Sequence, residues 1–206
     1  MLLYYVAVRS KKKEITADQI LTTVDQKAKE IGLTDEKSIF RVKGIVSKGW
    51  WNGLGSDALF VENAKAYKDK LDVWVTEDYS KWDLDSTYFD IVIKSYIALG
   101  DNQTAFDFAK KNKSNSIMIA AKNLGPEQVL EAANYELLES DKELKAADVD
   151  NIVTIVLDKC YASKYDQAVK ELLTGANNKY YKNIGKNTDW KTACTTIQLG
   201  LKRFDK

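Results

Sequence analysis

The sequence predicts an all-α protein built of helical hairpins. Apolar residues recur every three or four positions from Thr16 onward, which is the period of one helix face. No long segment alternates apolar and polar residues as a half-buried strand does, and short turns separate the helical segments. We expect an N-terminal segment and helical pair at 1–48 and a helical-repeat domain at 58–206, or else a single domain over 1–206.

The first helix is expected to begin at a capping box and to end at a glycine. Thr16 and Gln19 have the spacing at which each side chain bonds the other residue's backbone N–H, and Gly32 favours the left-handed conformation that ends a helix. A second helix begins near Asp35. The glycine-rich segment 48–57 predicts a break after it, and a junction between the N-terminal pair and the rest of the chain.

Later helices are expected at 58–82, 86–99, 102–112, 126–139, 146–162, 165–174 and 188–202. The first of these is ambiguous because residues 71–75 alternate like a short strand, although a helix is favoured. Pro126 stands in a first helical turn, where its missing N–H costs nothing. Ser140 and Glu143 have capping-box spacing and predict a helix start there.

Residues 86–112 carry the most specific pattern in the chain. An apolar first helix is followed by a turn with Gly100 and Asp101, and Ala105 is small enough to let two helix axes approach. The segment resembles one unit of a tetratricopeptide or pentatricopeptide repeat. Residues 155–175 resemble it again, with Ala168 at the position of Ala105 and Ser163 at that of Gly100.

The resemblance covers about residues 86–175, in about three hairpins, and implies a short α-solenoid with a concave binding surface. Pentatricopeptide repeats read bases through a polar residue near the start of the first helix. Ile91 lies near that position and offers no donor or acceptor, so modular base reading is not expected.

Composition excludes several chemistries. The chain has no histidine, which rules out Ser-His-Asp and Cys-His catalysis, and its two cysteines cannot form a four-thiolate zinc site. We expect Cys160 and Cys194 to be buried as small hydrophobes; a disulfide between them, in an oxidising compartment, is the alternative. No catalytic residue, cofactor or metal ligand is predicted. The net charge of +1 gives no general reason to bind a polyanion, and no DNA partner is expected.

The net charge is near zero because an acidic region and a basic region of the chain offset each other. Residues 57–90 hold nine carboxylates and four lysines, which we interpret as solvated faces and helix caps. The C-terminal residues 179–206 have a local charge of about +5 and interleaved aromatic residues, the combination that RNA-binding surfaces use. The candidate partner-binding residues are Lys179, Tyr180, Tyr181, Lys182, Lys186, Lys191 and Arg203, together with the loop tryptophans Trp50 and Trp51.

The leading hypothesis is a non-enzymatic helical-repeat scaffold or docking subunit that binds a protein or structured RNA within a larger complex. It is expected to be intracellular, in an organellar (mitochondrial) RNA or ribosome context. The alternative is an exported or cell-surface module, its leader removed, that binds glycan or peptide through tryptophans and carboxylates. A carboxylate-only hydrolase is the third reading. No transmembrane span is expected, because no apolar run approaches the roughly 20 residues that a span needs.

Overall fold

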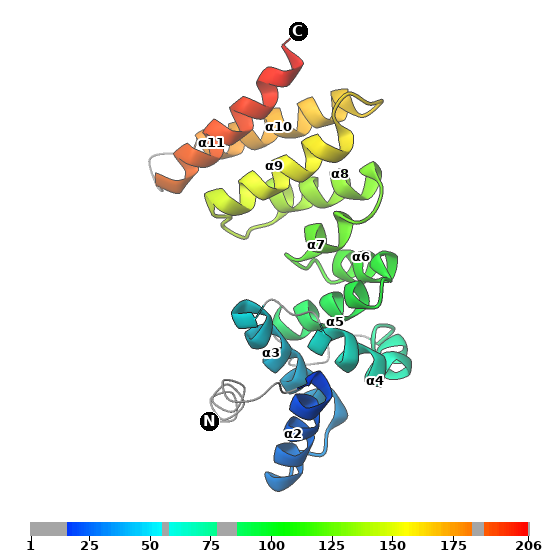
Figure 1. Ribbon diagram of the computed structural model, residues 1–206. Helices are drawn as coiled ribbons and strands as arrows, with labels where there is room; N and C mark the ends of the chain where they lie inside the picture. Colours follow the sequence, from blue (N-terminus) through cyan, green and yellow to red (C-terminus); the bar gives the residue numbers. More distant parts are fainter. Residues whose placement is uncertain (1–15, 55–57, 78–85, 183–187, 206) are drawn as a thin grey trace. The chain divides into compact units, whose positions relative to one another are not determined.

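The computed structural model describes residues 16–54, 58–77, 86–182 and 188–205, and every regular element within them is helical (Figure 1). The expected all-α class is therefore confirmed. The chain packs as two compact units, 1–108 and 109–206. The division falls inside helix α6 (Asn102–Lys111), and not in the glycine-rich segment 48–57.

Helix α2 (Ala17–Glu30) begins and ends as its sequence predicts. The backbone N–H of Gln19 donates to Thr16 Oγ1 at 3.3 Å, and the N–H of Thr16 donates to Gln19 Oε1 at 3.1 Å. Gly32 has a φ of 71°, in the left-handed region. Each of these signals acts between residues close in sequence, which is why the sequence suffices to place them.

Helix α3 (Glu36–Leu54) continues through residues 48–54, so the predicted helix break there is wrong. A glycine inside a helix lowers its stability by roughly 1 kcal/mol but does not end it, whereas a proline usually ends or kinks a helix. The chain's one proline is Pro126, so α3 contains none. Residues 55–57 lie outside the described part of the chain.

An aromatic core joins α3 to α4 (Ala58–Trp74) and α5 (Ser86–Ala98). The ring of Phe40 lies 5.4 Å from that of Tyr67, 5.6 Å from that of Trp74 and 6.3 Å from that of Tyr88. Leu71 is buried together with Trp74, which is the helical spacing of three. The ambiguous segment is therefore helical up to Trp74.

The turn between α5 and α6 has the predicted chemistry. Gly100 has a φ of 81°, and the carboxylate of Asp101 accepts a hydrogen bond from the backbone N–H of Thr104 at 3.1 Å. Ala105 is fully buried, in keeping with its role as a small residue between helices. Ile91 is also fully buried, so it presents nothing to a ligand.

Unit 2 consists of α7 (Ile117–Ala121), α8 (Pro126–Asn134), the π-helical turn η2 (Tyr135–Glu139), α9 (Ala146–Cys160), α10 (Asp166–Tyr181), α11 (Thr188–Leu201) and the short η3 (Lys202–Phe204). Pro126 occupies the first turn of α8, as expected.

The predicted capping box of Ser140 and Glu143 is wrong. Helix α9 starts later, and Asp148 accepts a hydrogen bond from the backbone N–H of Lys145 at 3.1 Å. The hydroxyl of Ser140 instead donates to Asn115 Oδ1 at 3.0 Å. A tertiary partner thus takes the side chain whose local spacing suggested a cap.

The second hairpin, α9 with α10, departs from the predicted repeat register. Ala168 is exposed, so it does not lie between helices as Ala105 does. Val169 is the fully buried residue four positions after the N-cap Tyr165, as Ala105 is four positions after Asp101. The left-handed residue of this turn is Ala162, with a φ of 56°, and not Ser163. The turn 161–165 is two residues longer than the turn 99–101, which shifts the register.

Several helices within each unit pack both on the next helix and on the next but one. In unit 1, α2 contacts α3 and α4, and α3 contacts α4 and α5; in unit 2, α8 contacts α9 and α10, and α9 contacts α10 and α11. Figure 1 shows α8 to α11 as successive layers.

Candidate functional site

The predicted basic surface does not form one patch, because its first residue is used inside the fold. The ammonium of Lys179 donates to the carbonyl oxygens of Leu138 at 3.1 Å and Ser140 at 3.2 Å. These carbonyls end the π-turn η2, and a lysine there satisfies backbone acceptors that the helix leaves open. Lys179 therefore joins α10 to η2.

Tyr180 belongs to the core of unit 2. Its side chain is 5% exposed, and its ring lies 6.3 Å from that of Trp190 in an edge-to-face arrangement. Burial, followed by the nearby Asp148, raises the pKa of Tyr180 to about 12. The phenol therefore stays protonated, and this residue holds the end of α10 against the start of α11.

Among the candidate partner-binding residues at this end, the accessible ones are Tyr181, Lys182 and Lys191, which we call the hairpin tip. Tyr181 is 65% exposed, and both lysines are exposed. Because Tyr180 packs on Trp190, their sequence neighbours are held at the same end of the α10 and α11 pair. The hairpin tip thus brings one large aromatic side chain and two cations together.

Carboxylates from a distant part of the sequence line a cavity at this end of unit 2. A cavity of about 360 Å³ is lined by Lys179, Tyr180 and Trp190 on one side and by residues 138–144 on the other. The second side includes Glu139, Asp141 and Glu143. Three carboxylates and two lysines, Lys142 and Lys179, thus line this cavity, so the surface at this end of unit 2 has mixed charge.

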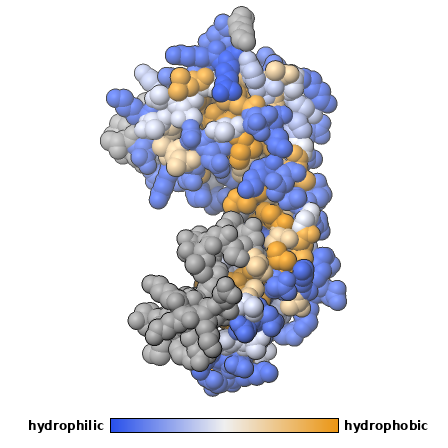
Figure 2. Space-filling view, in the orientation of Figure 1, coloured by the Kyte–Doolittle hydropathy of each residue, from blue (hydrophilic) through white to orange (hydrophobic). Residues whose placement is uncertain are grey.

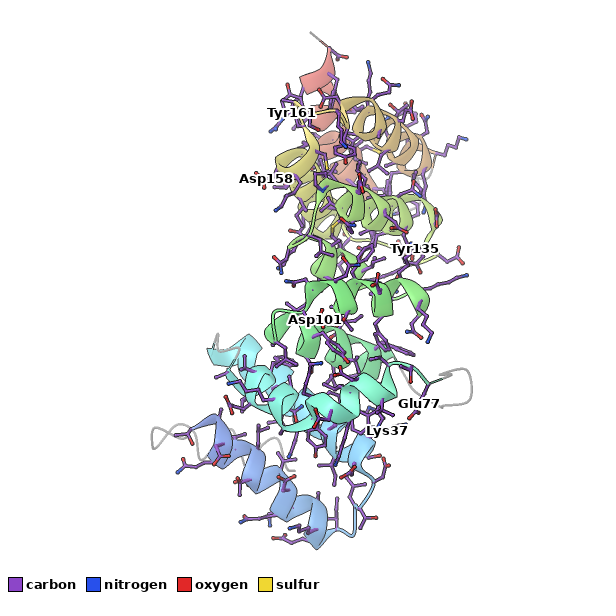
Figure 3. The ribbon with its side chains drawn as sticks, turned by 90° about the vertical axis from the view of Figure 1, so that its right-hand side faces the viewer. Lys37, Glu77, Asp101, Tyr135, Asp158 and Tyr161 are labelled. Atoms are coloured by element: carbon purple, nitrogen blue, oxygen red, sulfur yellow. The ribbon has the colours of Figure 1, made fainter. Side chains whose placement is uncertain are left out.

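Arg203 lies at the opposite end of α11. Its guanidinium is 5.9 Å from the ring centre of Tyr161, and its carbonyl accepts a hydrogen bond from the Tyr161 hydroxyl at 3.1 Å. Figure 3 shows Tyr161 at the C-terminal end of α9. Twelve residues separate Arg203 from Lys191, or roughly 18 Å along a helix. The two cations cannot share one small site.

The remaining candidates lie outside what the structure describes. Trp50 and Trp51 are in the last turns of α3, but their side chains are not among the described ones, and Lys186 and Trp82 are outside the described residues. Contact with glycan or peptide through these tryptophans stays a prediction.

Carboxylates of the acidic region 57–90 that the structure describes are largely paired with neighbouring cations. Lys68 contacts Asp72 at 2.6 Å, Lys94 contacts Asp90 at 3.0 Å, and Lys37 contacts Glu77 at 2.6 Å, a pair visible in Figure 3. Asp57, Asp78, Asp83 and Asp85 lie outside the described residues. The described part of this region is thus a set of ion-paired helix faces.

Sequence reasoning missed a buried carboxyl group in the π-turn η2. Glu136 is 7% exposed, and its Oε1 accepts a hydrogen bond from the backbone N–H of Met118 at 3.0 Å. π-helical turns occur often at functional sites. The sequence does contain one indication of this residue. Glu136 stands where the apolar stripe through Val129 and Ala133 would continue, a position at which a hydrophobic residue is expected.

Glu136 lines a cavity of about 260 Å³ between α7, η2 and α9. Burial raises the pKa of its carboxyl group to about 7, against the smaller opposing effects of the Met118 hydrogen bond and of Lys142; Asp148 also raises it. A carboxyl that titrates near neutrality beside a cavity is a common feature of binding and reaction sites.

Both cysteines are buried and free, as expected. Burial raises the pKa of each thiol, which lowers its reactivity. The described residues bring together no group of three or more Cys, Asp or Glu side chains able to hold a metal ion.

Among the described helices, none has the length and apolar character that a membrane span needs. Comparison of the chain with models of known protein families, with curated proteins and with solved structures finds no match in any of the three.

Proposed function

We propose that this chain is a non-enzymatic docking subunit of the helical-repeat type, and that it binds a protein partner at the hairpin tip. The observation that supports this proposal is that Tyr181, Lys182 and Lys191 are all exposed at the end of unit 2 where Tyr180 packs on Trp190. Exposed tyrosine is enriched at protein interfaces because one rigid side chain supplies both apolar area and a hydrogen bond.

Helices α2 and α3 in unit 1, and α8 and α9 in unit 2, each pack on the next helix and on the next but one, which supports a repeat architecture. Helix α11 presents Thr192, Thr195 and Gln198 to solvent, which is the polar outer face that a terminal repeat needs. Figure 2 shows hydrophilic residues over most of the described surface of unit 2 on the face that it draws. The described part of unit 2 exposes two large hydrophobic side chains, Tyr181 and Leu199 of α11, and Tyr181 is the one that lies at the hairpin tip.

Mixed charge favours a protein partner over RNA. An uncompensated basic surface favours RNA binding, whereas Glu139, Asp141 and Glu143 line the cavity beside Tyr180 and Trp190 at this end of unit 2. A protein surface that alternates both signs can match such a pattern and gain specificity from it. The intracellular, organellar setting that the repeat resemblance suggests remains part of this proposal.

The test compares two charge-reversal pairs in protein purified from its native cells. K182E with K191E reverses the hairpin tip, whereas K159E with K170E reverses two exposed lysines elsewhere in unit 2. Both pairs change the net charge equally, and each combines one lysine near a helix C-terminus with one near a helix N-terminus, so helix-dipole effects match.

We expect the first pair to reduce the amount of co-purifying protein partner about fivefold or more, and the second pair to leave it unchanged. Quantitative mass spectrometry before and after ribonuclease treatment gives the readout. Equal losses from the two pairs would refute the hairpin tip as the site, and loss of the partner on ribonuclease treatment would favour RNA instead.

A further inference from the structure

The cavity beside Glu136 is a second site, separate from the hairpin tip. Its volume of about 260 Å³ lies below the range of roughly 300–1,000 Å³ typical of drug-sized ligands. A nucleotide or an oligosaccharide is too large for it. The cavity has room for one long side chain or for a small molecule of similar size.

Glu136 is a buried acid in the cavity lining, and its hydrogen bonding is incomplete. One oxygen of Glu136 accepts the Met118 N–H, and the other has no hydrogen-bond partner among the described residues. Burying a carboxylate is unfavourable unless hydrogen bonds and an opposite charge compensate for the lost water. A ligand that brings a cation with several N–H donors supplies both.

The walls around this acid are partly apolar. Ile119, Ile152 and Ile155 line the cavity from α7 and α9, and the amides of Asn115 and Asn151 add acceptor oxygens. Apolar walls that lead to a buried acid suit an aliphatic stem with a charged end.

We propose that this cavity binds an alkyl cation, a guanidinium or ammonium group on an aliphatic stem, paired with Glu136 and with its stem against the isoleucines. Asp148, on the wall formed by α9, adds a second negative charge to the site. Lys122 and Lys142 also line the cavity and are exposed, as Asp148 is, and the positive charge of Lys142 lowers the pKa of Glu136. Long lysine side chains can turn their ammonium groups into water when a cationic ligand enters.

The cation has two possible sources with the same chemistry: a free small molecule, or an arginine or lysine side chain of a partner protein. Calorimetric titration of the full chain at pH 8 separates them. Butylguanidinium is the free probe and butylurea its neutral isostere; an acetylated and amidated Gly-Arg-Gly peptide is compared with the same peptide containing citrulline.

We expect each cationic probe that binds to do so at least about tenfold more tightly than its neutral isostere. Tighter binding of the peptide identifies a partner side chain, and tighter binding of butylguanidinium identifies a free ligand. Glu136→Gln should weaken binding about tenfold or more. Glu139→Gln, an exposed position in the same π-turn that does not line this cavity, should leave binding unchanged.

A measurement on the unmodified protein keeps the test independent of the folding of the variant. Binding of a cation at pH 7 should release a fraction of a proton from Glu136, detected by titration in buffers of different ionisation enthalpy, and binding should weaken at pH 5.5. No binding of either cation at pH 8, equal binding of the neutral isosteres, or binding without proton release would overturn the proposal. These outcomes leave the docking function at the hairpin tip untouched.

Discussion

Glu136 makes the stability of unit 2 depend on pH in the direction opposite to that of an ion-paired acid. Its pKa is raised from 4.5 to about 7 in the folded chain, so the folded state holds the proton more tightly than the unfolded state. The stabilisation is full below about pH 4.5 and is lost as the pH rises through 7. Lys142 opposes this effect and Asp148 adds to it, and Lys122 also lines the cavity.

Glu136→Gln should remove this contribution. Between pH 5 and 8 the free energy of unfolding of the unmodified chain should fall by about 2.5 kcal/mol through Glu136. The variant should lack that loss because glutamine does not ionise. Urea denaturation at several pH values measures it, with Glu139→Gln as the control. An unchanged pH profile in Glu136→Gln would show that the carboxyl is not desolvated as described.

Gly44 marks the closest approach of α3 to α5. A Cβ atom at this position would lie 2.3 Å from Cγ2 and 2.8 Å from Cδ1 of Ile91, which is itself fully buried. Gly44→Ala should therefore lower the free energy of unfolding by about 2 kcal/mol, even though alanine favours a helix by about 1 kcal/mol.

Two further variants separate the clash from a general effect of the substitution. Gly175→Ala, where the nearest atom is Leu138 Cδ1 at 3.3 Å, should change stability by less than about 0.5 kcal/mol. Combining Gly44→Ala with Ile91→Ala should cost less than the sum of the two single changes. Additive costs would mean that the two residues are not in contact.

At the residue scale, sequence reasoning succeeds where both partners are close in the chain. The capping box of Thr16 and Gln19 and the turn at Gly100 and Asp101 are such cases. Lys179 and Glu136 are the contrasting cases, because the carbonyl and N–H groups that they bind lie far away in sequence. No local pattern distinguishes a lysine that caps another helix from one that faces a ligand.

Substitution of two alanines, one in each hairpin, tests which residues pack between the helices. Ala105 of α6 is fully buried, whereas Ala168, the residue that corresponds to it in the sequence pattern, is exposed on α10. Ala105→Leu should lower the free energy of unfolding by about 1–3 kcal/mol through overpacking. Ala168→Leu should stay within about 0.5 kcal/mol of the original.

Thermal or urea unfolding of the two variants gives the comparison directly. Because the substitution is chemically identical, the difference between them reports only the packing of the two positions. A large loss for Ala168→Leu would restore the register that the sequence pattern suggested, with Ala168 between two helices.

At the element scale, the apolar periodicity of the sequence predicts where helices occur, but it predicts their first and last residues less well. The apolar stripes of α8 to α11 identify each helix, but α3 passes through three of its glycines because no proline stops it. The start of α9 could not be read from Ser140, whose hydroxyl donates to Asn115 of another segment. The cavity beside Glu136 depends on α7, η2 and α9 meeting, which no single element reveals.

For the whole molecule, charge must be counted in space and not along the chain. In the sequence, residues 179–206 resemble a basic tail suited to RNA. In the structure, Lys179 donates to backbone carbonyls and Arg203 lies at the far end of α11. Carboxylates of residues 139–143 line a cavity together with Lys179 and Tyr180. The candidate residues that remain exposed at this end are Tyr181, Lys182 and Lys191. The helical-repeat resemblance stays a prediction at this scale.

Position-specific photocrosslinking at the hairpin tip tests the docking proposal most directly. A photoreactive benzoylphenylalanine replaces Tyr181 in one sample and Thr174, an exposed residue of the same helix, in the other. We predict that irradiation in native cells joins position 181, and not position 174, to one protein, with or without ribonuclease treatment. Crosslinks of equal yield from both positions, or crosslinks from position 181 to RNA alone, would contradict a protein-docking surface at this end of unit 2.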